Sequence, residues 1–372
     1  MFWTDLIPEN IAVSKKAHHI GVYKIEGDFK VKVGVIDLRT LENDMSGVSY
    51  KFGVLSDTLL NVNGATDAEN TRNLDNFQNA INFFNDKEKV KFACVCGNMA
   101  VASNKSYEQY YKVPVFCAKG NKDFMQSNEV WWNKTMPAKN TKYKKIIYQD
   151  KKNTCNFYFI HDNSVFAFLS SDSVNGGVYL EDNLRWLHGV LDENRNKKCF
   201  VFLHSPIFNK AGNIYPKYYE LYGLNGLVYY GTDFDTYQKL RRLIEYYKNT
   251  VWFTGQTNYS LEAQVHSKTE NVEYDKDGAS NVAYNIHVPG CSYCNDVIES
   301  DATQELSKNT DVSQGFVVTV YKNYLVINGI TFKENGEFVN RYNPIGTYKL
   351  KTELVTVKSN MDLLNTVIDD IN

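Results

Sequence analysis

Five short apolar runs constrain the fold most, because each passes directly into Gly, Asn, His or a small polar turn. The first is FGVLSDTLLN, in which an apolar strand over 52–55 leads into Ser56 and Asp57. The others are 92–98 (FACVCGN), 115–123 (VFCAKGNKD), 199–206 (CFVFLHSP) and 251–258 (VWFTGQTN). Open α/β sheets bind their ligands at the carboxyl ends of strands. We therefore expect the five strand ends to meet at one rim and form a site.

Three stretches between these runs have apolar residues at helical spacing and are predicted to be amphipathic helices. They cover residues 74–84, 184–191 and 234–247. Further strands, without helices between them, are predicted over 157–160, 165–169, 283–288, 316–320 and 324–328. The charged stretches 262–278 and 295–313 are predicted to be exposed loops. Repeated βα units followed by late strands predict an α/β fold with two sheets face to face and helices outside.

The order and spacing of the five strand ends resemble the calcineurin-like metallophosphoesterases. The motifs of that family run Asp-x-His, Gly-Asp, Gly-Asn-His, a lone His and Gly-His-x-His. The matching positions here read Asp57-Thr58-Leu59, Gly97-Asn98, Gly120-Asn121-Lys122, His204 and Gly255-Gln256-Thr257-Asn258. The resemblance covers roughly residues 50 to 350. It implies a four-layer α/β/β/α metallophosphoesterase-like sandwich, here with a small N-terminal β element.

The family's metal ligands are largely replaced in this chain. The resemblance implies two divalent metals that share a bridging carboxylate and activate a water. The first metal would use Asp57, Leu59, Asn98 and Asn258, and the second Asn98, Asn121, His204 and Gln256. Leucine offers no lone pair, an amide oxygen has no net charge, and one carboxylate cannot neutralise two dications. We therefore predict no cofactor, no metal and no catalytic residue, and a residual pocket formed by Asp57, Asn98, Asn121, Lys122, His204, Gln256 and Asn258.

Lys122 occupies the place of the family histidine that assists the leaving group. Without a metal-bound nucleophile it has no attack to assist, so we expect its ammonium to pair with Asp57, directly or through one water. In the alternative, Lys122 points to solvent and Asp57 caps a nearby turn. His204 at a strand end and His287 within an apolar strand are expected to be hydrogen-bonded structural histidines.

The chain is expected to have three parts. Residues 1–50 contain an alternating pattern over 19–38, broken by a Gly-containing turn, which predicts a β-hairpin. This hairpin is expected to be an anchoring element that either packs on the main domain or docks on a partner chain. Residues 51–351 are the phosphoesterase-like domain, and 352–372 form a C-terminal docking segment with apolar residues at near-helical spacing. The aromatic stretches 122–152 and 209–232 are expected to be long loops, used for recognition or folded on their own aromatics.

Composition excludes several kinds of partner. The net charge is −2, from 41 basic and 43 acidic residues, which argues against nucleic acid or an anionic membrane surface. No apolar run approaches the roughly 20 residues that span a bilayer, and no signal peptide is visible, so we expect a virion or cytoplasmic location. The seven cysteines are expected to be buried free thiols. Among them, Cys291 and Cys294 form a lone C-x-x-C, for which a structural role is expected over a redox or zinc site.

These observations predict a non-catalytic phosphoesterase-like protein with a structural or binding role. The chain also resembles phosphoesterase-like proteins of bacteriophages, which implies a virion component of the tail or baseplate. Its partners would be other protein subunits, contacted through 1–50 and 352–372, with a cell-surface ligand as a further candidate. The alternative is a metal-dependent phosphodiesterase with altered, mononuclear metal use.

Overall fold

The computed structural model describes 13 segments of the chain: residues 19–26, 29–37, 47–99, 107–126, 145–150, 155–172, 179–207, 234–261, 272–273, 284–299, 304–322, 324–332 and 339–349. Most of the expected aromatic loops, most of 262–278 and the whole of 352–372 lie outside these residues. The chain divides into two compact units, Met1–Val48 and Ser49–Asn372. The boundary falls close to the one expected at residue 50.

The first unit contains one β-hairpin. Strand β1 (His19–Glu26) pairs antiparallel with β2 (Phe29–Asp37), and Glu26 lies opposite Phe29 beside the turn. The register shifts by one residue between Val22 and Tyr23, as in a β-bulge. The hairpin predicted over 19–38 is thus confirmed. A two-stranded hairpin is marginally stable by itself in water, so this element needs a surface to pack on.

The second unit contains two large sheets, and the first of them has six strands in the order β17-β16-β15-β3-β4-β5. Its strands are β3 (Val48–Leu55), β4 (Ala93–Val95), β5 (Val115–Cys117), β15 (Ser313–Tyr321), β16 (Tyr324–Phe332) and β17 (Val339–Lys349). Strands β3, β4 and β5 are parallel, whereas β15, β16 and β17 form an antiparallel meander. The carboxyl ends of the three parallel strands therefore lie at one edge.

The other large sheet has seven strands in the order β11-β12-β10-β9-β8-β7-β6. They are β6 (Ile147–Tyr148), β7 (Phe157–His161), β8 (Ser164–Phe168), β9 (Lys198–Phe202), β10 (Thr250–Thr254), β11 (Val272–Glu273) and β12 (Tyr284–His287). The central strands β8, β9, β10 and β12 are parallel, and β6, β7 and β11 are antiparallel to their neighbours.

Phenylalanine side chains fill the space between the two sheets. Phe52 of β3 meets Phe166 of β8 edge to face, with ring centroids 5.2 Å apart, and Phe166 stacks on Phe200 at 4.9 Å. Strand alternation explains this layer, since Phe52 and Val54 point to the sheet interface while Leu55 belongs to the cluster on the other face. Burying each such phenylalanine contributes about 1.5–3 kcal/mol.

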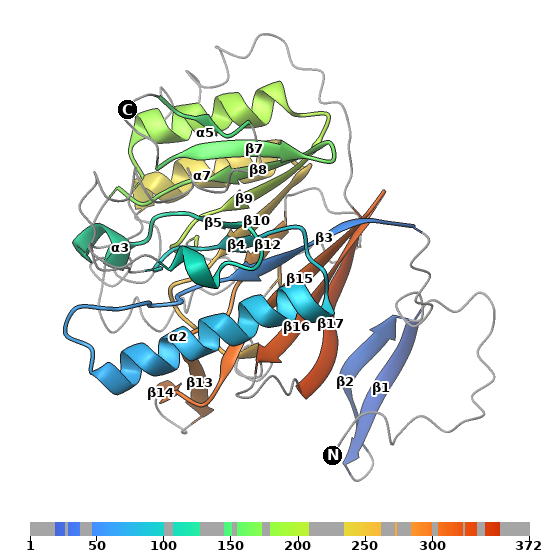
Figure 1. Ribbon diagram of the computed structural model, residues 1–372. Coiled ribbons are helices and arrows are strands. Elements are labelled where there is room, and N and C mark those ends of the chain that lie inside the picture. Colours follow the sequence, from blue (N-terminus) through green and yellow to red (C-terminus); the bar gives the residue numbers. More distant parts are fainter. Residues whose placement is uncertain are drawn as a thin grey trace. The chain divides into compact units, whose positions relative to one another are not determined.

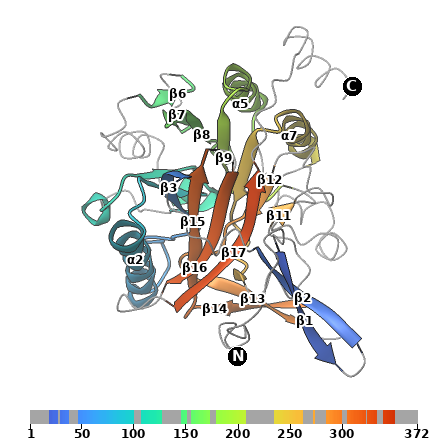
Figure 2. The ribbon, with the colours of Figure 1, turned by 90° about the vertical axis from the view of Figure 1, so that its right-hand side faces the viewer.

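Helices cover the outer faces of both sheets. Helix α2 (Asp67–Asn82) packs Phe77 and Ile81 on the six-stranded sheet, and its amino end is closed by a capping box between Thr66 and Glu69. Helices α5 (Glu181–Glu193) and α7 (Phe234–Tyr246) cover the seven-stranded sheet. Figures 1 and 2 show α2 on one side of the paired sheets and α5 and α7 on the other. The predicted α/β/β/α order of layers is confirmed.

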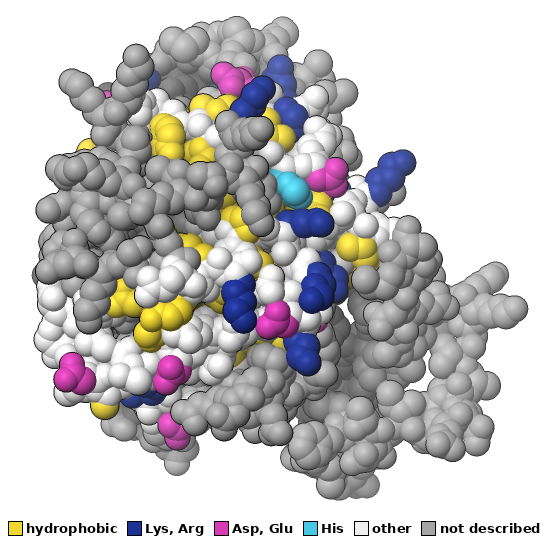
Figure 3. Space-filling view, viewed as in Figure 1, with side chains coloured by type: hydrophobic (Ala, Val, Ile, Leu, Met, Phe, Trp, Pro, Cys, Tyr) yellow, Lys and Arg dark blue, Asp and Glu magenta, His cyan; other side chains and the backbone are white. Residues whose placement is uncertain are grey.

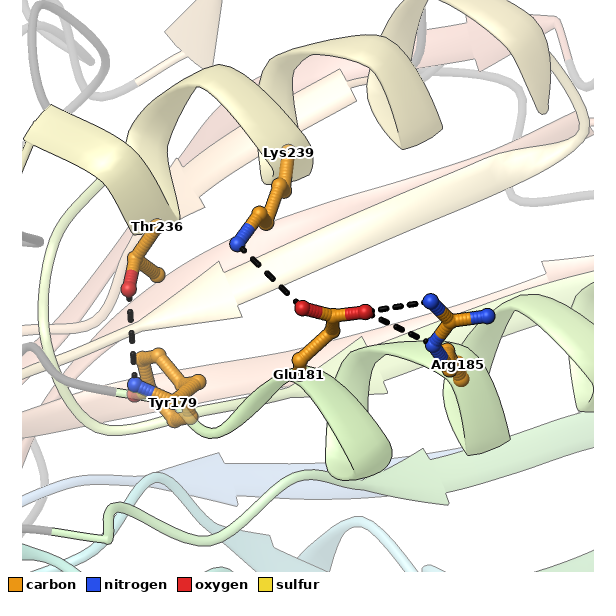
Figure 4. Close-up of polar contacts among 5 residues, drawn as sticks. All are labelled: Tyr179, Glu181, Arg185, Thr236 and Lys239. Atoms are coloured by element: carbon orange, nitrogen blue, oxygen red, sulfur yellow. Dashed lines mark hydrogen bonds and ion pairs between the residues drawn. The ribbon is translucent and has the colours of Figure 1, made fainter. Parts of the chain in front are cut away.

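Polar contacts join α5 to α7 above their shared apolar cluster (Figure 4). The Glu181 carboxylate forms an ion pair with Arg185 one turn later and lies 4.0 Å from Nζ of Lys239 on α7. The backbone N–H of Tyr179 donates to the Thr236 hydroxyl at 3.5 Å. The ion pairs of Glu181 are partly exposed, so the buried leucines beneath them supply more of the stability of this layer.

One expected loop is a hairpin. Strand β13 (Cys294–Glu299) pairs antiparallel with β14 (Gln304–Asn309), where the sequence predicted an exposed loop over 295–313. The prediction was wrong because charged side chains obscure the alternation, whereas backbone pairing does not depend on them. Three short helices complete the described elements: the π-helix η3 (Phe83–Lys87), the 3₁₀ helix η4 (Glu108–Tyr110) and α3 (Asn121–Gln126). Within the described segments, no helix combines the length and the apolar composition needed to cross a bilayer.

Candidate functional site

The five predicted strand ends meet at one rim, where the two sheets come together. Backbone hydrogen bonds connect the segments that follow the strands: Asp57 N–H donates to Gly97 O at 3.1 Å, and Gly255 N–H donates to His204 O at 2.8 Å. Cys291 N–H also donates to Ser56 O at 2.9 Å, which brings a sixth segment to the rim. The expectation of a single rim is confirmed.

Asp57 lies at the centre of this rim and is almost fully buried, with 1% of its surface exposed. Its Oδ1 accepts a hydrogen bond from the Asn98 amide at 2.9 Å. Its Oδ2 accepts from the Ser56 hydroxyl at 2.7 Å and from the Gln256 backbone N–H at 2.9 Å. A buried carboxylate without such donors would be strongly destabilising. Three donors from two sheets therefore solvate this charge within the protein.

Asn98 uses both ends of its side-chain amide. Nδ2 donates to Asp57, and Oδ1 accepts from the Lys122 backbone N–H at 2.9 Å. The side chain is thus committed to two neighbours, and 2% of the residue is exposed. At this position the resemblance implies a carboxylate that bridges two metal ions. An amide here supplies a donor to Asp57, whereas a carboxylate would repel it in the absence of a cation.

His204 is held by its two ring nitrogens. Nδ1–H donates to the backbone carbonyl of Cys96 at 2.8 Å, and Nε2 lies 3.1 Å from Oδ1 of Asn121, the first residue of α3. The close approach depends on Gly97, since a Cβ there would lie 2.6 Å from Nδ1 of His204 and the backbone has φ +80°. The expected hydrogen-bonded histidine is therefore present, and its Nε2 faces Asn121.

Gln256 and Asn258 follow β10 on the other side of Asp57. The backbone N–H of Gln256 supplies one of the three donors to Asp57. Gly255 makes this approach possible, because a Cβ there would lie 1.7 Å from Oγ of Ser56. Asn258 is 2% exposed, and its side-chain Oδ1 is buried without a hydrogen-bond partner in the described part of the chain. Buried amide oxygens of this kind are rare in proteins.

The rim residues share a left-handed backbone. Asp57, Asn98 and Asn258 have φ of 50°, 54° and 54°, a region that Asp and Asn tolerate. Leu59 at 48° and Gln256 at 72° have side chains that are unfavourable in this region. Strained backbone of this kind clusters at functional sites and persists only where the surroundings enforce it. The rim thus retains the backbone geometry of a functional site.

The structure does not form the expected direct contact between Lys122 and Asp57. Among the residues that the structure describes, no ion pair joins the two side chains. Lys122 contributes its backbone N–H to Asn98, while Asp57 is satisfied by Asn98, Ser56 and Gln256. The charge of Asp57 is therefore balanced by hydrogen-bond donors. Between these two described residues the direct ion pair is thus absent, the expected contact of Asn98 with Asp57 is present, and a contact between Lys122 and Asp57 through one water stays a prediction.

His287 lies beside the rim and corrects a further expectation. Its Nε2 contacts the Thr257 hydroxyl at 3.1 Å, but its Nδ1 is buried without a partner among the described residues. It is therefore only half satisfied as a core histidine. Burial lowers the pKa of His287 to about 3, and nearby His204 lowers it too, while Asp57 acts in the opposite direction. The imidazole is thus neutral over the physiological range.

The side chains at the rim do not fit a pair of metal ions. Leu59 is a hydrocarbon at one expected ligand position, and Asn98 is committed to Asp57 and Lys122. Three protein donors contact the Asp57 carboxylate, and these leave it fewer lone pairs to offer to a metal. In the described segments, no group of three or more His, Cys, Asp or Glu side chains is arranged to hold a metal. A dinuclear centre is therefore incompatible with this donor set.

The cysteines play no part in the site chemistry. All seven are buried and free, as expected from the sequence. Burial raises the pKa of Cys291 to about 12, and it raises the pKa values of Cys94, Cys96 and Cys117 well above their usual range. Thiols of this kind are poor nucleophiles and poor redox groups. The C-x-x-C at Cys291 and Cys294 is therefore structural.

Several residues of the site were not identified from the sequence. Ser56 was noted only as the start of a turn, although its hydroxyl donates to Asp57. The Cys96 carbonyl orients His204, and Asn295 of β13 donates through its side chain to the Thr257 carbonyl at 2.8 Å. Ser56 directly precedes Asp57, which could have identified it. No sequence signal connects Asn295 or the Cys96 carbonyl to the site.

Comparisons with known proteins give a match in structure but none in sequence. No protein-family model matches the chain, and no curated protein matches it. Purple acid phosphatase from yellow lupin (Lupinus luteus) seeds superimposes with a TM-score of 0.50 at 13% identity, over 80% of this chain and 53% of the phosphatase. The chain thus spans about half the length of that protein.

Two further solved structures match less well. A predicted phosphoesterase from Streptococcus pneumoniae matches with a TM-score of 0.31 at 8% identity, over 77% of this chain and 92% of its own. Vacuolar Protein Sorting 29 from Cryptosporidium parvum matches with a TM-score of 0.30 at 8% identity, over 78% and 95%. Fold identity therefore depends on the two facing sheets, the order of the five strand ends and the purple acid phosphatase match. On these grounds the chain has the calcineurin-like metallophosphoesterase fold.

Proposed function

We propose that this chain is a non-catalytic phosphoesterase-like protein with a structural or binding role in a larger assembly. The observation that carries the proposal is the hydrogen bond from the Asn98 amide to the Asp57 carboxylate, at 2.9 Å. It places a neutral donor where the fold family uses a bridging acid. The site is thereby closed by the chain's own side chains, which replace the charge of metal ions with hydrogen bonds.

The hydrogen bonds at the rim support a structural role for it. Asp57 and its three donors connect β3, β4 and β10, and His204 connects β9 to β4 and α3. Hydrogen bonds to a buried charge are worth about 1.5–3 kcal/mol each. These hydrogen bonds therefore hold the two sheets together at the rim, in the place where metal ions would do so.

The proposed assembly is a virion, at the tail or baseplate, with other protein subunits as partners. The support for assembly is the organisation of the chain, in which the hairpin of β1 and β2 belongs to a separate compact unit. Strand edges readily accept another chain. We propose that residues 1–50 and 352–372 contact the partners. A chain reduced to 48–351, which keeps the whole of β3, is then expected to fold cooperatively and to stay out of the complex, and its aggregation on purification would contradict this assignment.

A second candidate function is a phosphodiesterase with a mononuclear metal, and one contact favours it. His204 Nε2 and Asn121 Oδ1 are 3.1 Å apart, and both are acceptors when the imidazole is neutral with its proton on Nδ1. A proton on Nε2, a flipped Asn121 amide that donates through Nδ2, or a bound cation satisfies this pair. The Nδ1–H bond to the Cys96 carbonyl is also the kind of contact that orients a metal-binding histidine.

Phosphodiester hydrolysis distinguishes the two functions. The purified full-length chain is assayed on bis-p-nitrophenyl phosphate with Mn²⁺, Zn²⁺ and Mg²⁺ in turn, beside His204→Asn and Asp57→Asn variants. Turnover at the background level for all three proteins is expected. Metal-dependent turnover that both substitutions abolish would contradict the non-catalytic function and support the mononuclear phosphodiesterase.

A further inference from the structure

A basic hollow of about 780 Å³ lies at the opposite end of the strands from the candidate site. Four lysines and a histidine line it: Lys89, Lys91, Lys112, Lys145 and His161. Figure 3 shows several dark blue basic side chains on this face of the molecule, with acidic side chains between some of them and apolar ones nearby. The residues come from four separate segments of the chain, which the two sheets bring together.

The hollow is separate from the rim of Asp57. Lys91 stands just before β4 and Lys112 just before β5, and these two strands run parallel. The polar rim residues Asn98 and Asn121 follow the same two strands at their carboxyl ends. His161 ends β7, which is antiparallel to β8, so it lies at the amino end of the parallel strands of its own sheet. A ligand in the hollow therefore does not occupy the candidate site.

The positive charge of the hollow is partly compensated, by Asp86, which pairs with Lys112, and by Asp162, which lies close enough to act on His161. No described residue that lines it is an aspartate or glutamate, and Lys89, Lys91 and Lys145 have no ion-pair partner within the described segments. Lys112 Nζ lies 3.7 Å from Asp86 Oδ2, and both side chains are about half exposed, so this pair is weak. The whole chain has a net charge of −2. The positive charge is thus a local concentration and not a general property of the protein.

The walls of the hollow are apolar and fixed. Phe159, Val113 and Val90 are 1%, 5% and 6% exposed and contribute to its lining. Clefts that combine charge of one sign with low-dielectric walls focus the electric field. Backbone bonds hold the lysine-bearing loop in place, from Val90 N–H to Phe84 O and from Lys91 N–H to Lys51 O, each at 2.9 Å. Lys89, which precedes Val90 in this loop, has a left-handed φ of 54°.

We propose that this hollow binds a small molecule that carries two or more phosphate groups. Its volume lies in the range of small-ligand pockets, which is roughly 300–1,000 Å³. A lysine ammonium binds phosphate as a point charge, and the four lysines that line the hollow can contact several phosphate oxygens together. Asn85 and His161 add polar groups that can orient the ligand. The inference is independent of the proposed function, since it uses none of the rim residues.

Isothermal titration calorimetry of the full-length chain tests the proposal at 50 mM salt in the presence of a chelator. Inorganic tripolyphosphate and ATP are the probes, and citrate is the carboxylate control. The test variant is Lys91→Gln with Lys112→Gln. The matched control is Lys248→Gln with Lys308→Gln, which removes the same charge from α7's end and from β14. Lys89→Gln with Lys145→Gln serves as a second test variant, should the first fail to fold.

Tripolyphosphate is expected to bind the wild-type chain. Its affinity for the test variant is expected to be at least tenfold lower, and its affinity for the control variant within twofold of wild type. Binding is also expected to weaken steeply with salt. If ATP binds as tightly as tripolyphosphate, the phosphates alone are recognised. If ATP binds more tightly, its nucleoside also contacts the apolar wall. Both results support the proposal. Equal affinity for citrate, no binding of either probe, or binding unchanged in both test variants would overturn it.

Discussion

Replacing Asn98 by aspartate turns the central hydrogen bond of the rim into a repulsion. In the wild type, Asn98 Nδ2 donates to Asp57 Oδ1 at 2.9 Å, and both residues are at least 98% buried. The Asn98→Asp variant loses this donor and places a second carboxylate against the first. Aspartate tolerates the φ of 54° at this position, so backbone strain is unchanged.

The penalty can be worked out from the geometry. Two unit charges about 3 Å apart repel by roughly 5 kcal/mol at an effective dielectric constant of 20. The pair avoids this repulsion by binding one proton, whose pKa must then rise from about 4 to above 7, at a cost of about 1.4 kcal/mol per unit. We therefore expect the free energy of unfolding to fall by about 3–4 kcal/mol at pH 7.

The pH dependence identifies the cause. The folded variant binds a proton that the unfolded chain releases, so its stability relative to wild type increases as the pH falls. The penalty is expected to shrink by about 1.4 kcal/mol per pH unit between pH 7 and pH 5. The reference variant is Asn98→Gly, which accepts a positive φ and loses both hydrogen bonds without adding charge. Its penalty of about 1–3 kcal/mol is expected to change less with pH than that of Asn98→Asp, because it removes a donor from Asp57 without adding a second carboxylate.

Urea unfolding with a chelator present, followed by tryptophan fluorescence, measures both variants at pH 7, 6 and 5. Trp252 is fully buried and reports loss of the core. A wild-type midpoint for Asn98→Asp at pH 7 would refute the reasoning, because it would mean that Asn98 does not solvate Asp57. A penalty equal to that of Asn98→Gly at every pH would refute the charge repulsion.

Two further predictions concern residues beside the rim. Burial lowers the pKa of His287 to about 3, whereas its pKa in the unfolded chain is about 6.5. The folded state is therefore fully stable with respect to this group above about pH 6.5. As the pH falls from 6.5 toward 3, stability is lost by about 1.4 kcal/mol per pH unit. His287→Gln is expected to flatten that part of the stability curve in urea titrations from pH 7 to 4, and an unchanged slope would contradict the assignment. Gly97→Ala would place a Cβ 2.6 Å from His204 at φ +80° and is expected to cost about 2–4 kcal/mol in thermal unfolding. Gly189→Ala in α5, where nothing lies within 4 Å, is the control and is expected to be neutral or stabilising by up to about 1 kcal/mol; equal effects of the two substitutions would contradict the close packing at Gly97.

The layers of the fold could be predicted because their pattern is periodic and local. Alternation around Phe52 and the helical spacing of Phe77 and Ile81 specify which faces are buried, and β3 and α2 follow directly. The hairpin of β13 and β14 could not be predicted, since its strands have few apolar residues to reveal alternation. Its pairing depends on backbone hydrogen bonds that no side-chain pattern reports.

The sequence predicted where the site residues lie, but not which contacts their side chains form. Asp57, Asn98, His204 and Asn258 were placed correctly at strand ends, because strand exits carry chemistry in this architecture. Which group neutralises Asp57 depends on side-chain directions, and these follow from left-handed backbone angles at the rim. The basic hollow could not be predicted from the sequence, because its lysines are far apart in the chain and only the sheet topology brings them together.

Metal stoichiometry tests the central claim most directly, since the claim is that hydrogen bonds replace metal ions at the rim. The full-length chain, purified without chelator, is incubated with Mn²⁺, Zn²⁺ or Fe²⁺, desalted and analysed by inductively coupled plasma mass spectrometry, with Asp57→Ala as the control. We predict less than one tightly bound transition metal per chain, at the same level in both proteins. One or two metal ions per wild-type chain that are lost in Asp57→Ala would contradict the account.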